Sequence, residues 1–327
     1  MSPQTSPGTR GGPDGAGTVT GTGSRPGHGD RPTLVVLAGG RARRYGGVKP
    51  LAPVGPSGEA VIDLLASDAL EAGFGTIVLV IGPSTGPAIR YHVERTWPAA
   101  VDVRFAVQPV PRGTVHAVLA AADHLPDDGG FGVANADDLY GRQPLAQLAA
   151  HLAGDDPANA LIGFRLRHSV VGNEPVTRGI CEVGDDGLLR SIDERRKVVA
   201  LGGDRFVAED GRQPAELDGG ALVSMNLWAF RPSMRPVLEQ AMADAEVETG
   251  AEAAADAEVL LPEVVGDLLD GRRRAEGQAF RVLPTEGRCV GVTHPGDLVL
   301  VQAELCRQVG RGERPAAPWG ALLPAAG

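Results

Sequence analysis

The sequence has few cysteines, few lysines and no long apolar run, and these shortages narrow the class of protein that it can encode. Its 327 residues include three cysteines, an odd number, with wide spacing and no Cys-X-X-Cys pair. That pattern argues against a disulfide framework and a structural zinc site, and it is typical of a reducing compartment. No apolar run approaches the roughly 18 residues of a membrane span, and the N-terminal stretch lacks the apolar core of a signal peptide. We expect a cytoplasmic protein that binds no membrane.

Basic residues are fewer than acidic ones, which limits the partners. Lys and Arg together number 31, Asp and Glu number 41, and the formal net charge is -10. This balance argues against a general nucleic-acid surface, so any basic site must be local. Nearly all the basic residues are Arg, and lysine occurs only at Lys49 and Lys197.

Three segments of different composition follow one another along the chain. Residues 1–31 are rich in Gly, Pro, Ser and Thr and contain almost no apolar side chains. They cannot bury enough surface to offset the entropy of ordering, so we expect a disordered tail. Residues 32–310 have the apolar patterning of a folded domain, and residues 311–327 have the Pro, Ala and Gly content of a C-terminal tail.

Short apolar runs alternate with helical patterns in the first half of the domain. We expect strands at 33–38, 76–81, 101–107 and 132–136, and helices at 60–72, 88–96, 113–124 and 145–153. This alternation predicts an α/β fold with a Rossmann-like, mixed and mostly parallel sheet flanked by helices. Ligands of such sheets bind beyond the carboxyl ends of the strands. Polar residues follow three of these strands, at 39–49, 108–114 and 137–138, so we expect them to converge on one cleft.

The second half has a less regular pattern. We expect strands at 160–166, 179–183, 222–230, 280–283 and 289–292, helices at 237–258, 258–270 and 295–309, a turn at 184–187 and a surface loop at 198–220. The sequence contains no internal repeat, and in particular no hexapeptide array that would form a C-terminal β-helix.

The stretch Leu34–Val54 (LVVLAGGRARRYGGVKPLAPV) carries the clearest chemical information. Its buried strand ends at Gly39 and Gly40, where backbone N–H groups can approach phosphate oxygens closely. Neither a Walker A loop nor a Gly-X-Gly-X-X-Gly dinucleotide loop is present. The two glycines are followed instead by Arg44 and Lys49, cations that could neutralise a polyphosphate.

This stretch resembles the Leu-Ala-Gly-Gly…Lys-Pro-Leu signature of the sugar-1-phosphate nucleotidyltransferases, which have a GT-A-like nucleotidyltransferase fold. It departs from the family at Ala42, where a glycine is usual. The resemblance covers about residues 33–300. It continues at Gln108 with Gly113-Thr114-Val115-His116-Ala117, at Asn135-Ala136-Asp137-Asp138, at Asp193-Glu194-Arg195 and at Asn226-Leu227-Trp228-Ala229-Phe230. It implies a catalytic domain with a nucleotide-binding half at 32–155 and a sugar-binding half at 156–310.

The resemblance also implies roles for individual residues. The catalytic residues would be Arg44, Lys49 and Asp137. The nucleotide would be bound by Leu37, Ala38, Gly39, Gly40, Gln108, Gly113 and Thr114. The sugar phosphate would be bound by Arg178, Glu194, Arg195 and Asn226. Mg²⁺ would be held by Asp137, with Asp297 as its partner.

Some of these neighbours have a structural interpretation as well. We favour His116 as a helix residue packed at the cleft wall. Asp138 could support the metal ligand or cap a helix, and Asp297 could equally be an ordinary aspartate at a helix N-terminus. Trp228 and Phe230 are expected in the core.

The expected activity is Mg²⁺-dependent transfer of a nucleotidyl group from an NTP to a sugar-1-phosphate or a similar phosphate, such as a cyclitol phosphate, with release of pyrophosphate. Two alternatives stay open. A glycosyltransferase of the GT-A-like fold would use Asp137 and Asp138 for metal binding, but it has no need of Arg44 and Lys49. A non-catalytic regulatory subunit would bind NDP-sugars without turnover. The sequence does not determine the base of the NTP or the identity of the acceptor phosphate. It also does not determine whether the protein forms a homo-oligomer.

Overall fold

The computed structural model describes residues 31–40, 47–170, 172, 174–249, 257–292 and 296–320. The strands are β1 (Thr33–Ala38), β2 (Thr76–Ile81), β3 (Asp102–Val107), β4 (Phe131–Asn135), β5 (Asp138–Leu139), β6 (Asn159–Arg165), β7 (Val176–Val183), β8 (Leu189–Gly202), β9 (Arg205–Ala208), β10 (Glu216–Asp218), β11 (Leu222–Phe230), β12 (Phe280–Thr285) and β13 (Val290–Gly291). The helices are α1 (Val61–Glu71), α2 (Gly86–Thr96), α3 (Gly113–Ala120), α4 (Arg142–Ala153), α5 (Met234–Thr249), α6 (Leu261–Leu269) and α7 (Asp297–Gly310), with short 3-10 turns η2 (Lys49–Leu51), η3 (Ala122–His124) and η4 (Leu166–His168).

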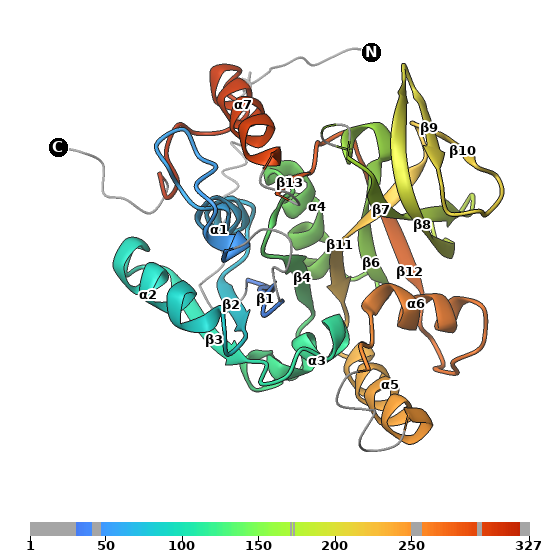
Figure 1. Cartoon of the computed structure of the whole chain (residues 1–327). Helices are drawn as coiled ribbons and strands as arrows, with labels where there is room; N and C mark the ends of the chain where they lie inside the picture. The colour runs from blue at the N-terminus through green and yellow to red at the C-terminus, as the bar shows by residue number, and fades with distance from the viewer. Residues whose placement is uncertain are drawn as a thin grey trace, which may run out of the picture.

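A single mixed sheet dominates the described part of the chain (Figure 1). It has 11 strands in the order β10-β9-β8-β7-β11-β4-β1-β2-β3, with β6 paired to β11 and β12. The strands β3, β2, β1 and β4 are parallel neighbours. Antiparallel pairing begins at β11 and continues through β7, β8, β9 and β10. The predicted α/β class with a mixed sheet is confirmed, and its parallel strands are concentrated on the N-terminal side.

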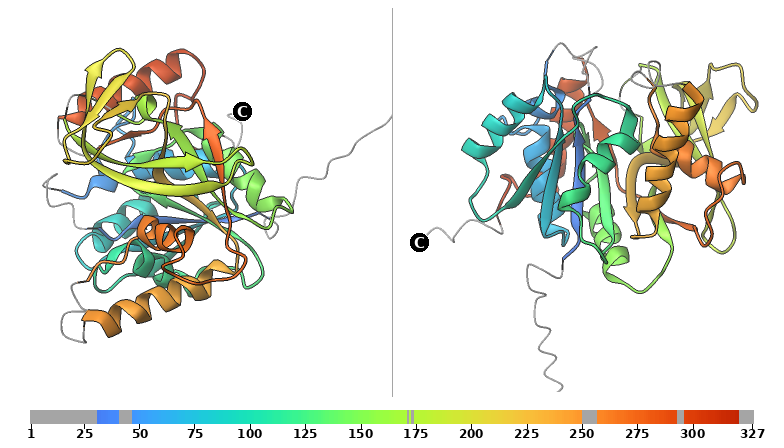
Figure 2. Two further views of the ribbon diagram at one scale, coloured as in Figure 1. Left: turned by 90° about the vertical axis from the view of Figure 1, so that its right-hand side faces the viewer. Right: turned by 90° about the horizontal axis from the view of Figure 1, so that it is seen from below.

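Helices cover both faces of the sheet (Figure 2), so the inner strands are apolar on both sides. Leu34 and Val36 of β1 face one core, which also contains side chains of α1, α2 and α4. Val35 faces the other core, together with α3, α5 and α6. Alternate strand residues point to opposite faces, which explains why β1 and β2 read as unbroken apolar runs. Within the described residues, no helix is both long enough and apolar enough to cross a membrane.

The segment 198–220, which the sequence analysis predicts to be a surface loop, forms strands instead. β8 runs on to Gly202, and β9 and β10 add two antiparallel strands beyond it. The prediction was wrong because this ribbon is largely solvent-exposed, and its buried apolar residues are separated by glycines and charged residues; they are Val198, Phe206, Ala208 and Leu217. Pairing between β8, β9 and β10 stabilises the ribbon, and the amino-acid composition of the segment does not predict this pairing.

The helix predicted at 237–258 begins earlier, and α5 spans Met234–Thr249, while residues 250–256 lie outside the described residues. Residues 257–260 are not helical, and Leu260 is extended. α6 then begins at Leu261 with Pro262 in its first turn, a position where proline's missing N–H costs no helical hydrogen bond. Residues 257–260 form one wall of the cleft described below.

The C-terminal boundary expected at residue 310 is placed too early. The segment 311–320 packs against α1, and both Arg314 and Trp319 are buried. The Arg314 guanidinium makes two hydrogen bonds to the Asp68 carboxylate, at 3.0 and 2.5 Å. Trp319 lies 5.2 Å from Trp97 between ring centroids. After β13, the described residues therefore form α7 and this packed segment rather than the coils of a β-helix.

Candidate active site

The polar residues predicted to converge do so at the carboxyl ends of the parallel strands. The N–H of Ala136, just after β4, donates to the Leu37 carbonyl oxygen of β1 at 3.2 Å, and the N–H of Gln108, just after β3, donates to the Ile81 oxygen of β2 at 2.9 Å. A cavity of about 720 Å³ opens there, which we call the nucleotide cavity. Its lining includes most of the predicted nucleotide-binding residues, namely Leu37, Gly39, Gly40, Gln108, Gly113 and Thr114. Ala38, the remaining one, packs in the core.

Gly39 sits where a side chain does not fit. A Cβ on Gly39 would lie 2.7 Å from the Gln108 side-chain oxygen, and a Cβ on Gly82 would lie 2.8 Å from the Gly39 carbonyl oxygen. The two glycines thus let the ends of β1 and β2 approach each other and leave room for Gln108. This close approach explains why the first residue of the Gly-Gly pair is a glycine, which has no Cβ.

We expect Gly39→Ala to lower kcat/KM for the nucleotide about tenfold, because the added methyl group must displace the Gln108 amide. Steady-state kinetics with varied NTP would measure the effect. Gly310→Ala is the matched control, since a Cβ at Gly310 meets no atom within 4 Å. Equal kinetics for the two variants would contradict this role of Gly39.

The loop between β3 and α3 is held by side chains within the cavity wall. The Gln108 amide donates to the Gly113 carbonyl oxygen at 3.1 Å. The Nδ1 atom of His116 lies 3.0 Å from the Val110 carbonyl oxygen and 3.2 Å from the Gln108 amide nitrogen. Burial lowers the pKa of His116 and favours the neutral ring. These contacts agree with the structural interpretation of His116 as a packed wall residue.

Residues 257–261, which we call the strap, cross the N-terminus of α3. The N–H of Val259 donates to the Arg112 oxygen, and the N–H of Val115 donates to the Val259 oxygen, both at 3.1 Å. Gly113 has a φ of 86°, and a Cβ there would lie 2.6 Å from the Val259 nitrogen. A glycine is therefore required by both the backbone angle and the close approach. Nothing in the local sequence marks the strap, and it was not predicted.

Lys49 and Asp137 face each other across the cleft. The Lys49 ammonium, positioned by η2, lies 3.5 Å from the Asp137 carboxylate. Both residues line a second cavity of about 450 Å³, which we call the acceptor cavity, and Asp297 at the start of α7 lines it too. The structure thus brings together three of the predicted catalytic and metal residues. Arg44 lies outside the described residues.

A hydrogen-bonded network ends at Asp138, the residue that follows Asp137. The Asn135 amide donates to the Asp138 carboxylate at 3.0 Å, and the Asn226 amide donates to the Asn135 oxygen at 2.7 Å. The Trp228 indole N–H donates to the Asn226 oxygen at 2.7 Å. Asp138 is enclosed beside Asp137, and this burial, together with the neighbouring charge, raises its pKa to about 6. Both aspartates line the acceptor cavity, but Asp138 is also hydrogen-bonded to Asn135.

Asn226, predicted as a sugar ligand, also makes two side-chain hydrogen bonds within the protein. Asn226 lines the acceptor cavity, but its amide oxygen and nitrogen are both bonded to protein side chains. Its φ of 59° is in the left-handed region, where the register of β11 shifts against β6. Its clearest role is to connect Trp228 with Asn135. Trp228 and Phe230 are fully buried, as predicted.

The two neighbours Glu194 and Arg195 lie on opposite faces of β8. Glu194 lines the acceptor cavity, but Arg195 does not. The Arg195 guanidinium is buried and makes two hydrogen bonds to Asp210, at 2.8 and 3.1 Å. This ion pair lowers the pKa of Asp210. The expected phosphate contact of Arg195 is corrected, because successive strand residues cannot face the same ligand.

Unlike Arg195, Arg178 lines the acceptor cavity. Its guanidinium donates to the Thr177 oxygen at 2.7 Å, to the Ser169 hydroxyl at 3.2 Å and to the Ser169 carbonyl oxygen. Burial lowers the pKa of Arg178, while the charge of Asp138 opposes that shift. These contacts hold the side chain in place beside the cavity that Lys49 also lines.

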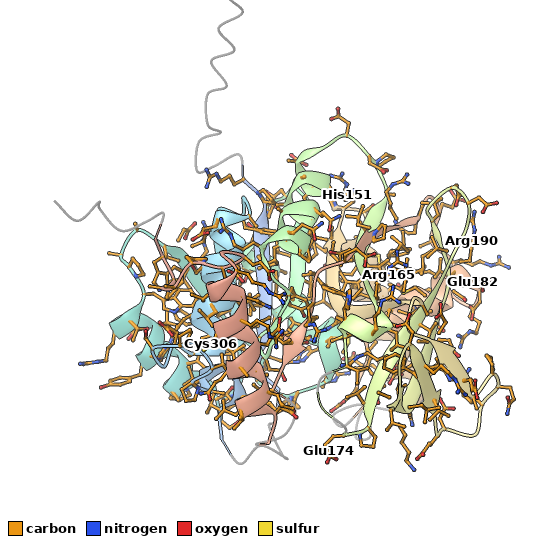
Figure 3. All side chains as sticks on the ribbon, turned by 90° about the horizontal axis from the view of Figure 1, so that it is seen from above. His151, Arg165, Glu174, Glu182, Arg190 and Cys306 are labelled. Carbon is orange, nitrogen blue, oxygen red and sulfur yellow. The ribbon has the colours of Figure 1, made fainter. Side chains whose placement is uncertain are left out.

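Several residues of the acceptor cavity carry no motif and were missed. They are Ser169, Glu174, Val176, Ile192, Leu260 and Pro262. Figure 3 places Glu174 at one end of the β7–β8 ribbon and Glu182 and Arg190 at its opposite end, and of these three residues only Glu174 lines the cavity. Arg165 and His151, also labelled there, and Cys306 on α7 do not line it.

Comparisons with known proteins agree with this geometry. Two curated relatives are each called "Bifunctional protein GlmU". The one from Hyphomonas neptunium is 31% identical over 169 residues, which cover 50% of this chain and 33% of the relative. The one from Acidiphilium cryptum is 31% identical over 139 residues, which cover 41% of this chain and 28% of the relative. The chain therefore spans about a third of the length of these relatives.

Solved structures share the fold. HddC from Yersinia pseudotuberculosis, complexed with GMP-PN, superimposes with a TM-score of 0.54 at 17% identity, covering 84% of this chain and 99% of HddC. A second structure of the same protein gives a TM-score of 0.53 at 16% identity, with the same coverage. At this identity the likeness establishes the GT-A-like nucleotidyltransferase fold alone.

The match to a protein family is more extensive. The MobA-like NTP transferase domain matches residues 34–256, which is more than half of the chain and includes the Gly-Gly turn, Gln108 and Asp137. The chain therefore belongs to the MobA-like NTP transferase domain family and is a nucleotidyltransferase.

Proposed function

We propose that the protein transfers a nucleotidyl group from an NTP to a sugar-1-phosphate or a chemically similar phosphate, with release of pyrophosphate. One observation carries this proposal. The nucleotide cavity and the acceptor cavity are parts of one cleft, since Thr114, Asn135, Asp137 and Leu260 line both. A donor and an acceptor can therefore meet beside Asp137. The GlmU relatives and the HddC complex with GMP-PN support the assignment of the donor side.

The reaction needs no covalent enzyme intermediate, because the acceptor phosphate is itself a nucleophile. Its oxygen attacks the α-phosphorus, a new P–O bond forms, and the bond to the leaving pyrophosphate breaks. The main obstacle is repulsion between two polyanions. Lys49 and Arg178 line the acceptor cavity and supply positive charge there. We propose that Lys49 neutralises the reacting phosphates and that Arg178 holds the acceptor.

The donor set fits a magnesium ion that the substrates help to bind. Asp137 and Asp297 both line the acceptor cavity, while the described residues contain no group of three or more His, Cys, Asp or Glu side chains arranged around a metal. Mg²⁺ is usually held by one or two carboxylates together with phosphate oxygens and water, so two aspartates suffice. When bound, the ion would neutralise phosphate charge. We propose Asp137 as its first ligand and Asp297 as the second.

We expect Lys49→Met to lower kcat about 100- to 1000-fold, because the developing phosphate charge loses a preorganised cation. Methionine keeps much of the length of lysine and removes only the charge. Lys197→Met is the matched control, since Lys197 is the chain's other lysine and lies exposed on the β8 ribbon. Initial rates of pyrophosphate release would decide the matter, and a Lys49→Met enzyme as active as the control would exclude this role.

The decisive test of the function is a pyrophosphate-release screen of all NTPs against sugar-1-phosphates and cyclitol phosphates in the presence of Mg²⁺. Release with at least one pair is the expected result. Release of a nucleoside diphosphate from an NDP-sugar, without pyrophosphate, would favour the glycosyltransferase alternative. Tight binding of an NDP-sugar without any turnover would favour the regulatory alternative. In either case the proposed function fails.

A further inference from the structure

The strap carries a carboxylate, that of Glu258, which is not part of the family signature. This carboxylate borders the nucleotide cavity. Glu258 lines this cavity together with Gln108 and Gly113. Among the described residues, its carboxylate has no hydrogen-bond or ion-pair partner, whereas Glu246, at the end of α5, is paired with Arg112 at 2.7 Å. Glu258 is exposed at the cavity wall and available to a ligand.

The position of Glu258 is set by its neighbour in the strap. Val259 is held by two backbone hydrogen bonds, to Arg112 and from Val115. Two residues further on, the N–H of Leu261 donates to the Thr114 hydroxyl at 2.8 Å. These three bonds attach the strap to the first turn of α3, directly beside the cavity. The Glu258 carboxylate is thus carried by a fixed segment.

We propose that Glu258 reads the base of the NTP and selects guanine. The proposal rests on the proposed function, because it assumes that an NTP occupies the nucleotide cavity. A carboxylate is acceptor-only and can receive two parallel N–H donors. On its hydrogen-bonding edge, guanine presents two adjacent donors, the N1–H and the 2-amino group. These two groups match the two oxygens of Glu258.

The other bases match this carboxylate less well. Adenine and cytosine each offer one amino group next to a ring nitrogen whose lone pair would face the second carboxylate oxygen. Uracil and thymine offer a single N–H between two carbonyl oxygens, which a carboxylate repels. The first-turn N–H groups of α3, at Gly113 and Thr114, have no acceptor within the helix and could donate to the guanine O6 atom. The lining of the cavity therefore includes both the acceptors and the donors that guanine requires.

Equilibrium binding of GTP, ITP, ATP, CTP and UTP to the whole chain, in the presence of Mg²⁺, tests the inference without requiring a known acceptor. We expect GTP to bind at least tenfold more tightly than the other standard NTPs. ITP lacks only the 2-amino group and should bind about tenfold more weakly than GTP. Glu258→Ala should weaken GTP binding about 10- to 100-fold, in keeping with a hydrogen bond to a charged group, and should bring GTP and ITP to similar affinities.

The controls separate this inference from the function on which it rests. Glu239→Ala removes an exposed carboxylate of α5 whose ion-pair partner is Arg235 in the same helix, and it should leave all five affinities unchanged. Glu258→Gln keeps the shape but lacks the second acceptor oxygen, so it should also lose the preference for GTP over ITP. If another NTP binds best, or if Glu258→Ala leaves the ratio of GTP to ITP unaltered, the inference is overturned and the proposed function stands. If none of the NTPs binds, the proposed function itself fails.

Discussion

Replacing Asp137 by Asn should lower the rate of pyrophosphate release at least about a thousandfold while leaving the fold intact. The carboxylate is placed after β4, in both cavities, and we propose it as the first ligand of Mg²⁺. An amide of the same shape is a much weaker ligand for a hard cation, so the variant would hold less of the ion that neutralises the phosphate charge. Single-turnover rates at saturating Mg²⁺ would measure the loss.

The stability of the Asp137→Asn variant should differ little from that of the parent. The Asp137 side chain is 36% exposed, and its contact with Lys49 is long, at 3.5 Å, so little folding energy depends on it. Asp127→Asn, in an exposed turn before β4, provides a matched control for the loss of one surface charge. Near-normal turnover by Asp137→Asn would mean that the metal is held elsewhere. A large drop in its melting temperature would mean that the residue is structural.

Arg314→Ala should destabilise the protein by about 3–5 kcal/mol, because it leaves the Asp68 carboxylate buried without its partner. Both side chains of this pair are almost completely buried, at 5% and 3% exposure. Urea unfolding at neutral pH would measure the change. Arg311→Ala, whose side chain is exposed and lies 3.7 Å from Glu313, is the control and should change stability by less than about 1 kcal/mol.

The effect of Arg314→Ala should also depend on pH. Burial raises the pKa of Asp68 to about 6 even though Arg314 opposes the shift, and removing the arginine should raise it further. A carboxyl whose pKa is higher in the folded state favours folding when protonated, and this contribution is lost as the pH rises through the folded pKa. The variant should therefore lose most stability near pH 7 and much less near pH 5. A loss that is the same at both pH values would show that packing, not charge burial, dominates.

The features of the fold and site that were predicted correctly depend on residues within one strand or just after it. β1 and β2 are buried on both faces, so their apolar runs identify them without further context. Gly39, Gln108 and Asp137 each follow a parallel strand directly. Because parallel strands end at the same edge of the sheet, the order of the elements was enough to bring these residues together.

The parts that were missed depend on contacts between distant segments. Arg195 was predicted to bind a phosphate, but its guanidinium binds Asp210. Asp210 lies in the 198–220 segment, which was predicted to be a loop. Glu258 lies in the strap, whose backbone hydrogen bonds connect it with α3, more than a hundred residues earlier in the chain. Arg314 follows a helix and resembles a solvated tail residue until its contact with Asp68 is known. None of these three contacts leaves a periodic pattern in the sequence.

The central position of β11 has a consequence for how the protein is made. On the ribosome, the parallel strands β3, β2, β1 and β4 are complete once Asn135 has been synthesised, but β4 gains its next neighbour only when β11 (Leu222–Phe230) emerges. β6 likewise waits for β12 (Phe280–Thr285) before its second edge is covered. Such long-range pairing is slow, and an open sheet edge is prone to intermolecular pairing. A nascent or truncated chain that stops between these strands should therefore depend on chaperones, and the two halves of the domain should not fold when they are produced separately.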